Sequence, residues 1–284
     1  MYFLLAVSVF AASFNSVLLN KSGASGKDTV FKFNFLCSIV WCVLLFLANG
    51  CTLHINFQVV LWGVLYGIAQ ICFLVFKTLS MSTGSVSVTT LIGNSSLLIS
   101  IFVSLVLWKE TVSVTDIVAL LFLCLAIFLC TYKKSDKQCT AGWKYYVFFF
   151  FVFAASVGLI FKGFGKVVNL KYCGDMMLLS AMVMALGNLA IGWFTDGKLV
   201  VGKQNLKAFL LFALGSGILS CLYNRLNIYL AGSVDAIIFF PCFNGGVVLL
   251  STLLSVAFLK EKLFTVQKIG LIIGVISICV IGIF

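Results

Sequence analysis

Long apolar runs recur along the whole 284-residue chain and limit how it can fold. Each run holds about 20 residues, the length that an α-helix needs to cross the hydrocarbon core of a bilayer. None of them alternates apolar and polar residues as the strands of a membrane β-barrel do. We therefore expect an all-α membrane protein with ten transmembrane helices, at about 2–20, 29–49, 57–80, 84–108, 114–132, 144–165, 174–195, 206–231, 234–259 and 266–284.

The composition excludes a water-soluble domain, because 62% of the residues are hydrophobic and only 10% are charged. The net charge of +11 does not indicate a nucleic-acid partner, since the basic residues lie mostly in short loops between apolar runs. The 11 cysteines are scattered and contain no CxxC pair, so they indicate neither a metal site nor a bound cofactor. We expect an integral, multi-pass protein surrounded by lipid, in a bacterial plasma membrane.

Two short segments indicate an internal repeat. Phe10-Ala11-Ala12-Ser13 in the first apolar run returns as Phe153-Ala154-Ala155-Ser156 in the sixth. A repeat of five spans contains an odd number of crossings, so its two copies cross the membrane in opposite directions. Inverted repeats of this kind are a common plan for transporters. We expect the first five-helix repeat, with the start of the linker, at 1–138 and the second at 139–284.

A second pair of segments repeats in the same order. Lys77 lies seven residues before Gly84-Ser85-Val86, and Arg225 lies seven residues before Gly232-Ser233-Val234. An apolar run follows each segment, and Lys-Glu closes each copy. The matched layout predicts a duplicated helix pair with a basic residue in each copy.

Loop charges predict the orientation in the membrane. Setting Lys77 and Arg225 aside, 13 lysines follow the odd-numbered runs: Lys21, Lys27, Lys32, Lys133, Lys134, Lys137, Lys144, Lys198, Lys203, Lys207, Lys260, Lys262 and Lys268. The other side holds four: Lys109, Lys162, Lys166 and Lys171. Because positive residues favour the cytoplasm, both termini are expected outside it.

The residues that end the third and fourth runs carry a family resemblance. Lys77-Thr78-Leu79 before Gly84-Ser85-Val86, with Leu107-Trp108-Lys109-Glu110 closing the fourth run, resembles the drug/metabolite transporter superfamily, EamA-like branch. The family's Gly-Glu pair is here Lys109-Glu110 and Lys260-Glu261, so the glycine is missing. The resemblance implies a single-chain carrier of metabolites with a central cavity, peripheral fifth and tenth spans, and both termini in the cytoplasm, contrary to the loop charges.

Lys77 and Arg225 are the first candidates for substrate binding. A fixed charge within a span is costly and often functional, and a cavity-facing pair could hold a carboxylate or phosphate. The alternative is that both side chains extend to the lipid headgroups, since each lies roughly 10 Å from its helix end.

Polar residues in the middle of spans are further candidates. Asn94 and Asn244 could bind a polar substrate or join helices by hydrogen bonds. Gln70, Tyr223 and Asn224 lie on the third and eighth runs and could complete a polar patch around the substrate.

Pro241 is the only proline and lies within the ninth run, followed by Gly245 and Gly246. A proline removes a backbone donor, so we expect a kinked or broken helix, as either a gate or a static bend that improves packing. Glu110 and Glu261 close the fourth and ninth runs, where a capping role is favoured over proton coupling.

The sequence favours a secondary transporter, independent of ATP, that moves a small polar metabolite by alternating access. The two basic residues favour an anionic or zwitterionic substrate such as an amino acid or organic acid, and H⁺ or Na⁺ is a possible coupling ion. A membrane-embedded enzyme and a structural membrane subunit remain the alternatives, and no oligomeric state is indicated.

Overall fold

The structure is a computed structural model that describes residues 1–22, 27–110, 112–131, 140, 142–196, 206–259 and 263–283. Within these ranges the chain forms α-helices and one short 3-10 helix, η1: α1 (Tyr2–Ser22), α2 (Lys27–Ala48), α3 (Phe57–Thr83), α4 (Val86–Trp108), α5 (Val114–Thr131), α6 (Trp143–Val167), η1 (Leu170–Tyr172), α7 (Cys173–Asp196), α8 (Leu206–Ser233), α9 (Ala236–Leu259) and α10 (Thr265–Ile283).

The expectation of an all-α, multi-pass membrane protein is confirmed. In the described ranges, nine helices are long and apolar enough to cross a membrane, and α10 offers a shorter apolar stretch, Thr265–Ile281. Large apolar side chains also face outward, such as Leu121 on α5 and Ile272 on α10, which are 64% and 63% exposed. A bilayer would cover such surfaces, whereas water would not favour them.

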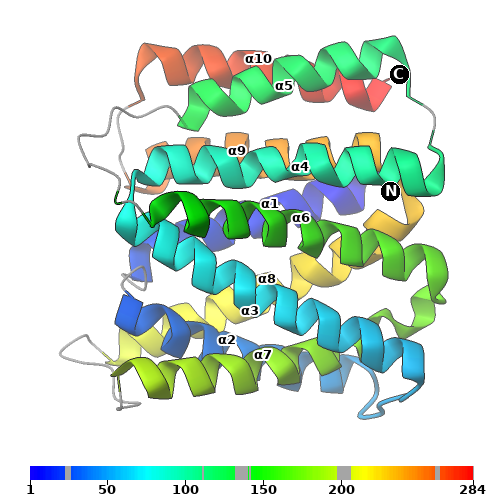
Figure 1. Ribbon diagram of the computed structural model, residues 1–284, viewed down its shortest axis with the longest axis vertical. Coiled ribbons are helices and arrows are strands. Elements are labelled where there is room, and N and C mark those ends of the chain that lie inside the picture. Colours follow the sequence, from blue (N-terminus) through cyan, green and yellow to red (C-terminus); the bar gives the residue numbers. More distant parts are fainter. Residues whose placement is uncertain are drawn as a thin grey trace.

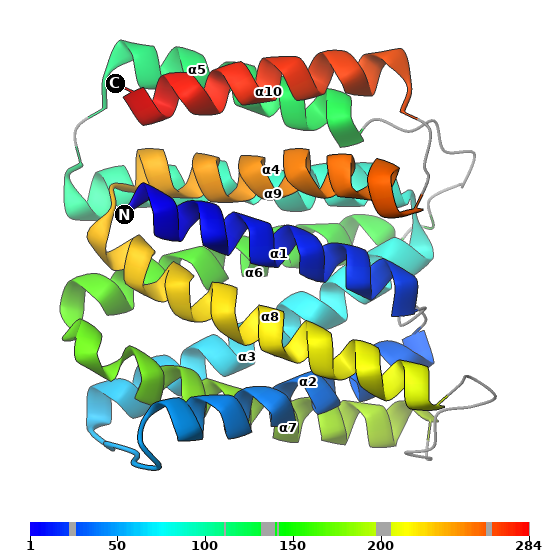
Figure 2. The same ribbon diagram turned by 180° about the vertical axis from the view of Figure 1, so that it is seen from behind.

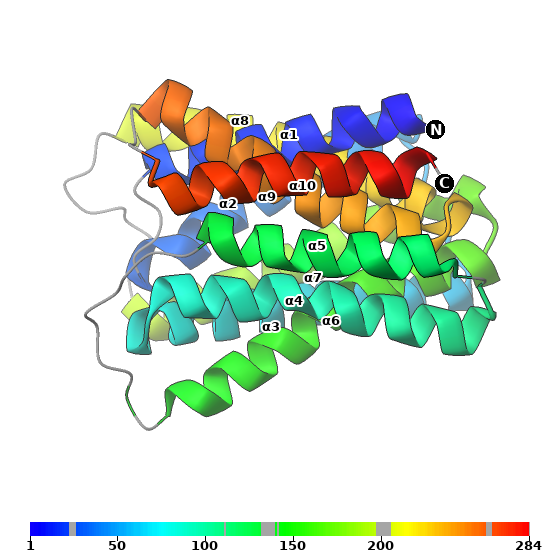
Figure 3. The same cartoon turned by 90° about the horizontal axis from the view of Figure 1, so that it is seen from above.

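The helices are arranged in successive layers (Figure 1). The pair α5 and α10 forms one edge, followed by α4 with α9, then α1 with α6, then α3 with α8, and finally α2 with α7 at the other edge. Figure 3 shows α5 and α10 as an outer pair beside α4 and α9, the peripheral position expected for the fifth and tenth spans.

Both ends of the chain lie at one end of the helix bundle (Figures 1 and 2). Each helix crosses back along the bundle, so α1 and α6 run in opposite directions. The turns after α2, α4, α6 and α8 lie at the same end as the termini.

Local interactions fix several helix ends. The Asn56 side chain accepts a hydrogen bond from the Val59 N–H (2.8 Å) and caps α3. The Asp116 carboxylate accepts one from the Ser113 N–H (3.1 Å) at the start of α5. Lys109 adopts a left-handed conformation (φ 52°) directly after Trp108, which ends α4.

The expected break at Pro241 is absent, because α9 continues as one helix through the proline from Ala236 to Leu259. Pro241 stands in the second turn, where its missing N–H leaves only the carbonyl of a first-turn residue without its helical partner. Gly245 and Gly246 allow neighbouring helices to approach. A Cβ on Gly245 would lie 2.8 Å from Leu123 of α5, and one on Gly246 would lie 3.0 Å from Val9 of α1. These features favour the packing alternative.

Some expectations concern residues outside the described ranges. These are Glu261, the boundary between residues 138 and 139, and seven of the lysines used for the orientation: Lys133, Lys134, Lys137, Lys198, Lys203, Lys260 and Lys262.

Candidate functional site

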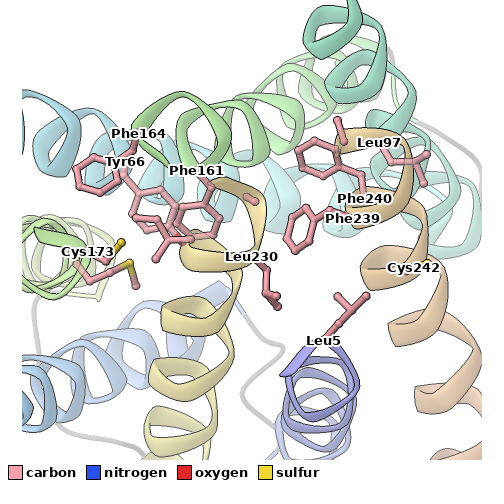
Figure 4. Packing of buried hydrophobic residues seen from close by; sticks show 14 of the residues in the cluster. Leu5, Tyr66, Leu97, Phe161, Phe164, Cys173, Leu230, Phe239, Phe240 and Cys242 are labelled. Carbon is pink, nitrogen blue, oxygen red and sulfur yellow. The ribbon is translucent and has the colours of Figure 1, made fainter. Parts of the chain in front are cut away.

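A buried polar network joins α3 to α8 in the interior of the bundle. The Tyr66 hydroxyl donates a hydrogen bond to Oδ1 of Asn224 (3.1 Å), and Nε2 of Gln70 donates to the Tyr66 oxygen (2.6 Å). Asn224 in turn donates to the Ser220 carbonyl (2.9 Å). The Tyr66 ring is fully buried and stacks on Phe161 of α6, with centroids 4.6 Å apart (Figure 4). Two residues predicted from the sequence, Gln70 and Asn224, therefore meet here.

The same network continues from α8 to α1. The Ser8 hydroxyl donates to Oδ1 of Asn227 (2.6 Å), and the Ser216 hydroxyl donates to Oδ1 of Asn15 (2.5 Å). All four side chains are buried. We call this set the polar network; it consists of Ser8, Asn15, Tyr66, Gln70, Ser216, Ser220, Asn224 and Asn227.

The network lies on one stripe of each helix. On α8 its members follow a spacing of three or four residues, which places them on one face. On α3, Tyr66 and Gln70 share a face with Lys77, because seven residues make nearly two full turns. The half-buried Lys77 ammonium lies over the Phe73 ring, 5.6 Å from its centroid. Lys77 therefore lies on the network's face, about 10 Å along α3 from Gln70.

Arg225 does not share this face. At about 100° per residue, it lies roughly 140° around α8 from Ser220 and 160° from Asn227. Its guanidinium lines a cavity of about 420 Å³ beside η1 and the start of α7. The structure thus brings Lys77, but not Arg225, onto the helix face that carries the polar network.

A difference of register explains why the two basic residues diverge. The Gly-Ser-Val match relates residue 84 to residue 232. This match separates corresponding residues by 148 positions (232 − 84). The last residues of α3 and α8, Thr83 and Ser233, are instead 150 positions apart. The turn hydrogen bonds agree with the helix ends, with Gly84 N–H to Ser80 O and Val234 N–H to Leu230 O. In this register, Asn227 corresponds to Lys77. Two residues rotate a side chain by about 200°, which carries Arg225 to the other face.

Of the remaining predicted residues, Tyr223 contacts the network, whereas no hydrogen bond within the described ranges joins Asn94 or Asn244 to it. The Tyr223 carbonyl is 3.4 Å from the Ser8 hydroxyl, and its ring lies 6.3 Å from that of Phe243. Asn244 donates to the Phe240 carbonyl of its own helix (3.0 Å). Asn94 is half-buried on α4 and makes no hydrogen bond within the described part of the chain. Neither asparagine joins two helices.

A buried ion pair lies at the end of the bundle that holds the termini. Nζ of the fully buried Lys162 lies 2.6 Å from Oε1 of Glu110, and it donates to the Val234 carbonyl (2.7 Å). The other Glu110 oxygen accepts the Ala236 N–H (2.7 Å) at the start of α9. These bonds join the end of α4, the end of α6 and the turn between α8 and α9. We call this region the sealed end.

The sealed end corrects the expectation for Lys162 and adds a partner to the one for Glu110. Lys162 lies inside α6 and is not a loop residue, so it is no marker of membrane orientation. Glu110 caps α9, as the favoured reading required, but its carboxylate is also paired with a buried ammonium. The sequence signal for this pair was the position of Lys162 within an apolar run.

Glycines bring α6 and α8 together at the sealed end. A Cβ on Gly165 would lie 2.4 Å from the Cα of Gly232, so the two backbones are in direct contact. At the other end, which we call the opposite end, α1 and α3 are the helices that the repeat expected from the sequence would match to α6 and α8, and they are not among the closely packed helix pairs of the described residues.

Sequence reasoning found two of the eight network residues, Gln70 and Asn224, and missed the other six. The missed residues are single polar side chains within apolar runs, where each alone attracts little notice: Ser8, Asn15, Tyr66, Ser216, Ser220 and Asn227. The useful signal is the row of serines and asparagines at helical spacing on α8.

Comparison with known proteins informs the fold alone. No protein-family model and no curated protein matches the chain. A solved structure described only as "Crystal structure of protein" is similar, with a TM-score of 0.72, 16% sequence identity, and coverage of 99% of this chain and 97% of that chain. At this identity, the likeness shows a shared helical fold.

Proposed function

We propose that the protein is a secondary transporter that moves a small polar metabolite across the membrane by alternating access. The polar network carries this proposal. Side chains that can bond a polar solute are costly within a bilayer, and here they meet between helices of both chain halves. A structural subunit would need only helix-joining pairs, whereas this network shares a face with a half-buried lysine.

We further propose that the two halves are inverted repeats, as in the EamA-like branch of the drug/metabolite transporters. Two glycine contacts support this. A Cβ on Gly67 of α3 would lie 2.7 Å from Val183 of α7, and one on Gly217 of α8 would lie 2.8 Å from Val40 of α2. The Gly217 contact repeats the Gly67 contact with the halves exchanged. The glycines of the two contacts are 150 positions apart in the sequence. The valines of the two contacts are 143 positions apart, which is also the separation of Phe10 and Phe153.

The proposed substrate is anionic or zwitterionic, such as an amino acid or an organic acid. Lys77 supplies a cation on the inner face of α3, while Gln70 and Asn224 offer amide groups about two to three turns away. An ammonium binds a carboxylate, and the amides bind the remaining polar atoms. H⁺ or Na⁺ remains the proposed coupling ion.

Alternating access requires that the two ends of the bundle open in turn. The ion pair between Lys162 and Glu110 supports a state that is closed at the sealed end. In the other state this pair would separate, and α1 would close on α3.

A ligand screen followed by counterflow tests the proposal. Purified protein is heated with amino acids, organic acids, sugars and phosphorylated metabolites, and ligands that raise the melting temperature are reconstituted in proteoliposomes. We expect exchange of a labelled acid without ATP, and its loss in Asn224→Ala. A well-folded protein that exchanges none of these compounds would contradict the transporter assignment.

A further inference from the structure

Arg225 lines a cavity that the proposed transport path does not use. The cavity, of about 420 Å³, lies between η1, the first turn of α7 and the outer face of α8. We call it the Arg225 cavity; its lining residues are Leu170, Lys171, Cys173, Gly174, Leu222, Arg225, Leu226 and Tyr229.

The polar side of this cavity is cationic. Arg225 and Lys171 supply two positive charges, and neither forms an ion pair with a carboxylate in the described part of the chain. Lys171 lies over the Tyr172 ring, with its ammonium 4.7 Å from the centroid. A guanidinium without an acidic partner presents a planar set of donors that suits the oxygens of a phosphate.

The apolar side of the cavity opens on the outer surface of the bundle. Leu222 and Tyr229, one turn before and after Arg225, are 44% and 43% exposed. Leu170 and Leu226 complete the apolar wall. Lys171 lies in the connection between α6 and α7, so the cationic groups are near the end of the spans, where lipid headgroups lie.

We propose that the Arg225 cavity binds the phosphate of an anionic phospholipid, with the acyl chains along the exposed apolar face of α8. A free phosphate would use the same two cations but would gain nothing from the leucines. A transport substrate would lie along the face of α8 that carries Asn227. Arg225 is on the far side of the helix from that face, so this substrate would not reach it.

The test uses delipidated, full-length protein in detergent. The protein is titrated with phosphatidylglycerol, with phosphatidylcholine of the same acyl chains, and with inorganic phosphate, while native mass spectrometry and melting temperature report binding. Phosphatidylcholine carries a compensating cation, so we expect phosphatidylglycerol to bind more tightly and inorganic phosphate to bind weakly.

The variants separate the two cations from general surface charge. We expect Arg225→Gln to weaken phosphatidylglycerol about tenfold and Lys171→Gln about fivefold, with Arg225→Lys in between. Lys109→Gln, which removes an exposed charge at the same end of the bundle, serves as the control and should change nothing. If Arg225→Gln fails to fold, Lys171→Gln and Arg225→Lys decide the matter.

Two outcomes would overturn the proposal. Equal phosphatidylglycerol affinity in the wild type and in the folded Arg225 and Lys171 variants would show that the cavity holds no phosphate. Inorganic phosphate that binds as tightly as phosphatidylglycerol would show an ion site without a role for lipid. Neither outcome depends on transport, so the proposed function is tested separately.

Discussion

The two ends of the bundle differ in how closely their helices are held together. At the sealed end, α6 contacts α8 through Gly165 and Gly232, and Lys162 is paired with Glu110. At the opposite end, α1 and α3 are not among the closely packed helix pairs of the described ranges, and Leu19 stands where the Phe-Ala-Ala-Ser register would place a second Lys162. Of these two positions, 162 and 19, only position 162 carries an ammonium that can form such an ion pair.

If the two halves are the inverted repeats proposed above, this difference would favour the state that is closed at the sealed end. A buried ion pair is not a strong source of stability in itself, because both charges lose their hydration. Here the geometry satisfies both partners, since Lys162 also donates to Val234 and Glu110 also accepts from Ala236. Removal of one charge leaves the other buried without its partner. The stability of the protein should therefore fall when either residue alone is replaced, and should largely recover when both are replaced.

The largest effect is expected from Lys162→Met. It leaves the Glu110 carboxylate buried without its partner, which should lower the free energy of unfolding by about 3–5 kcal/mol. The double variant Lys162→Met/Glu110→Gln removes both charges and should recover most of the loss. Denaturant titration in detergent measures both. A double variant as unstable as the single one would mean that the pair's electrostatics do not explain the loss.

The next largest effect is a difference in substrate affinity between variants of the two basic residues, Lys77 and Arg225. Lys77→Gln should weaken an anionic substrate by about 2–3 kcal/mol, the scale of a charge-assisted hydrogen bond in a partly dry site. Arg225→Gln should leave substrate affinity unchanged, because Arg225 faces away from the polar network. Ligand titration of both folded variants compares them, and equal losses would return Arg225 to the substrate site.

A smaller effect is expected from the helix crossing at the sealed end. Gly165→Ala places a methyl group against the Gly232 backbone, which should cost about 1–3 kcal/mol in stability. Gly215→Ala is the matched control, since its new methyl group would meet only the tip of the Leu18 side chain at 3.3 Å. Similar melting temperatures for both variants would argue that the α6–α8 contact is not tight.

The smallest effect concerns the two asparagines in the middle of spans. Asn244→Ala removes a hydrogen bond to its own helix and should change stability by less than about 1 kcal/mol. Asn224→Ala leaves the buried Tyr66 hydroxyl without its acceptor and should cost about 1–3 kcal/mol. Melting curves of the two variants, recorded together, test this order.

Much of the fold could be predicted because a bilayer restricts it so strongly. A run of about 20 apolar residues has few alternatives to a spanning helix, and the predicted runs agree with the observed helices to within a few residues. Helix ends were less accurate, since they depend on local caps. A separate error concerned Arg225, because the Gly-Ser-Val match differs by two residues from the alignment of the ends of α3 and α8 and so paired Arg225, rather than Asn227, with Lys77.

The site was harder to predict because it depends on contacts between distant segments. Gln70 and Asn224 were found as polar residues in apolar runs, but their link through Tyr66 spans 158 positions. The pairing of Lys162 with Glu110 depends on how α6 crosses the turn after α8, which no local pattern encodes. Pro241 predicted a kinked or broken helix, whereas α9 runs through it without a break, and Gly245 and Gly246 lie where neighbouring helices approach closely.

The account depends most on the claim that the ion pair closes one end of the path to the polar network. Gln70→Cys in a chain without other cysteines can be labelled with a membrane-impermeant maleimide in vesicles of known orientation. We expect labelling from the opposite end only, and labelling from both ends once Lys162→Met/Glu110→Gln is added. Labelling from the sealed end with the ion pair intact, or no change when the pair is replaced, would contradict the account.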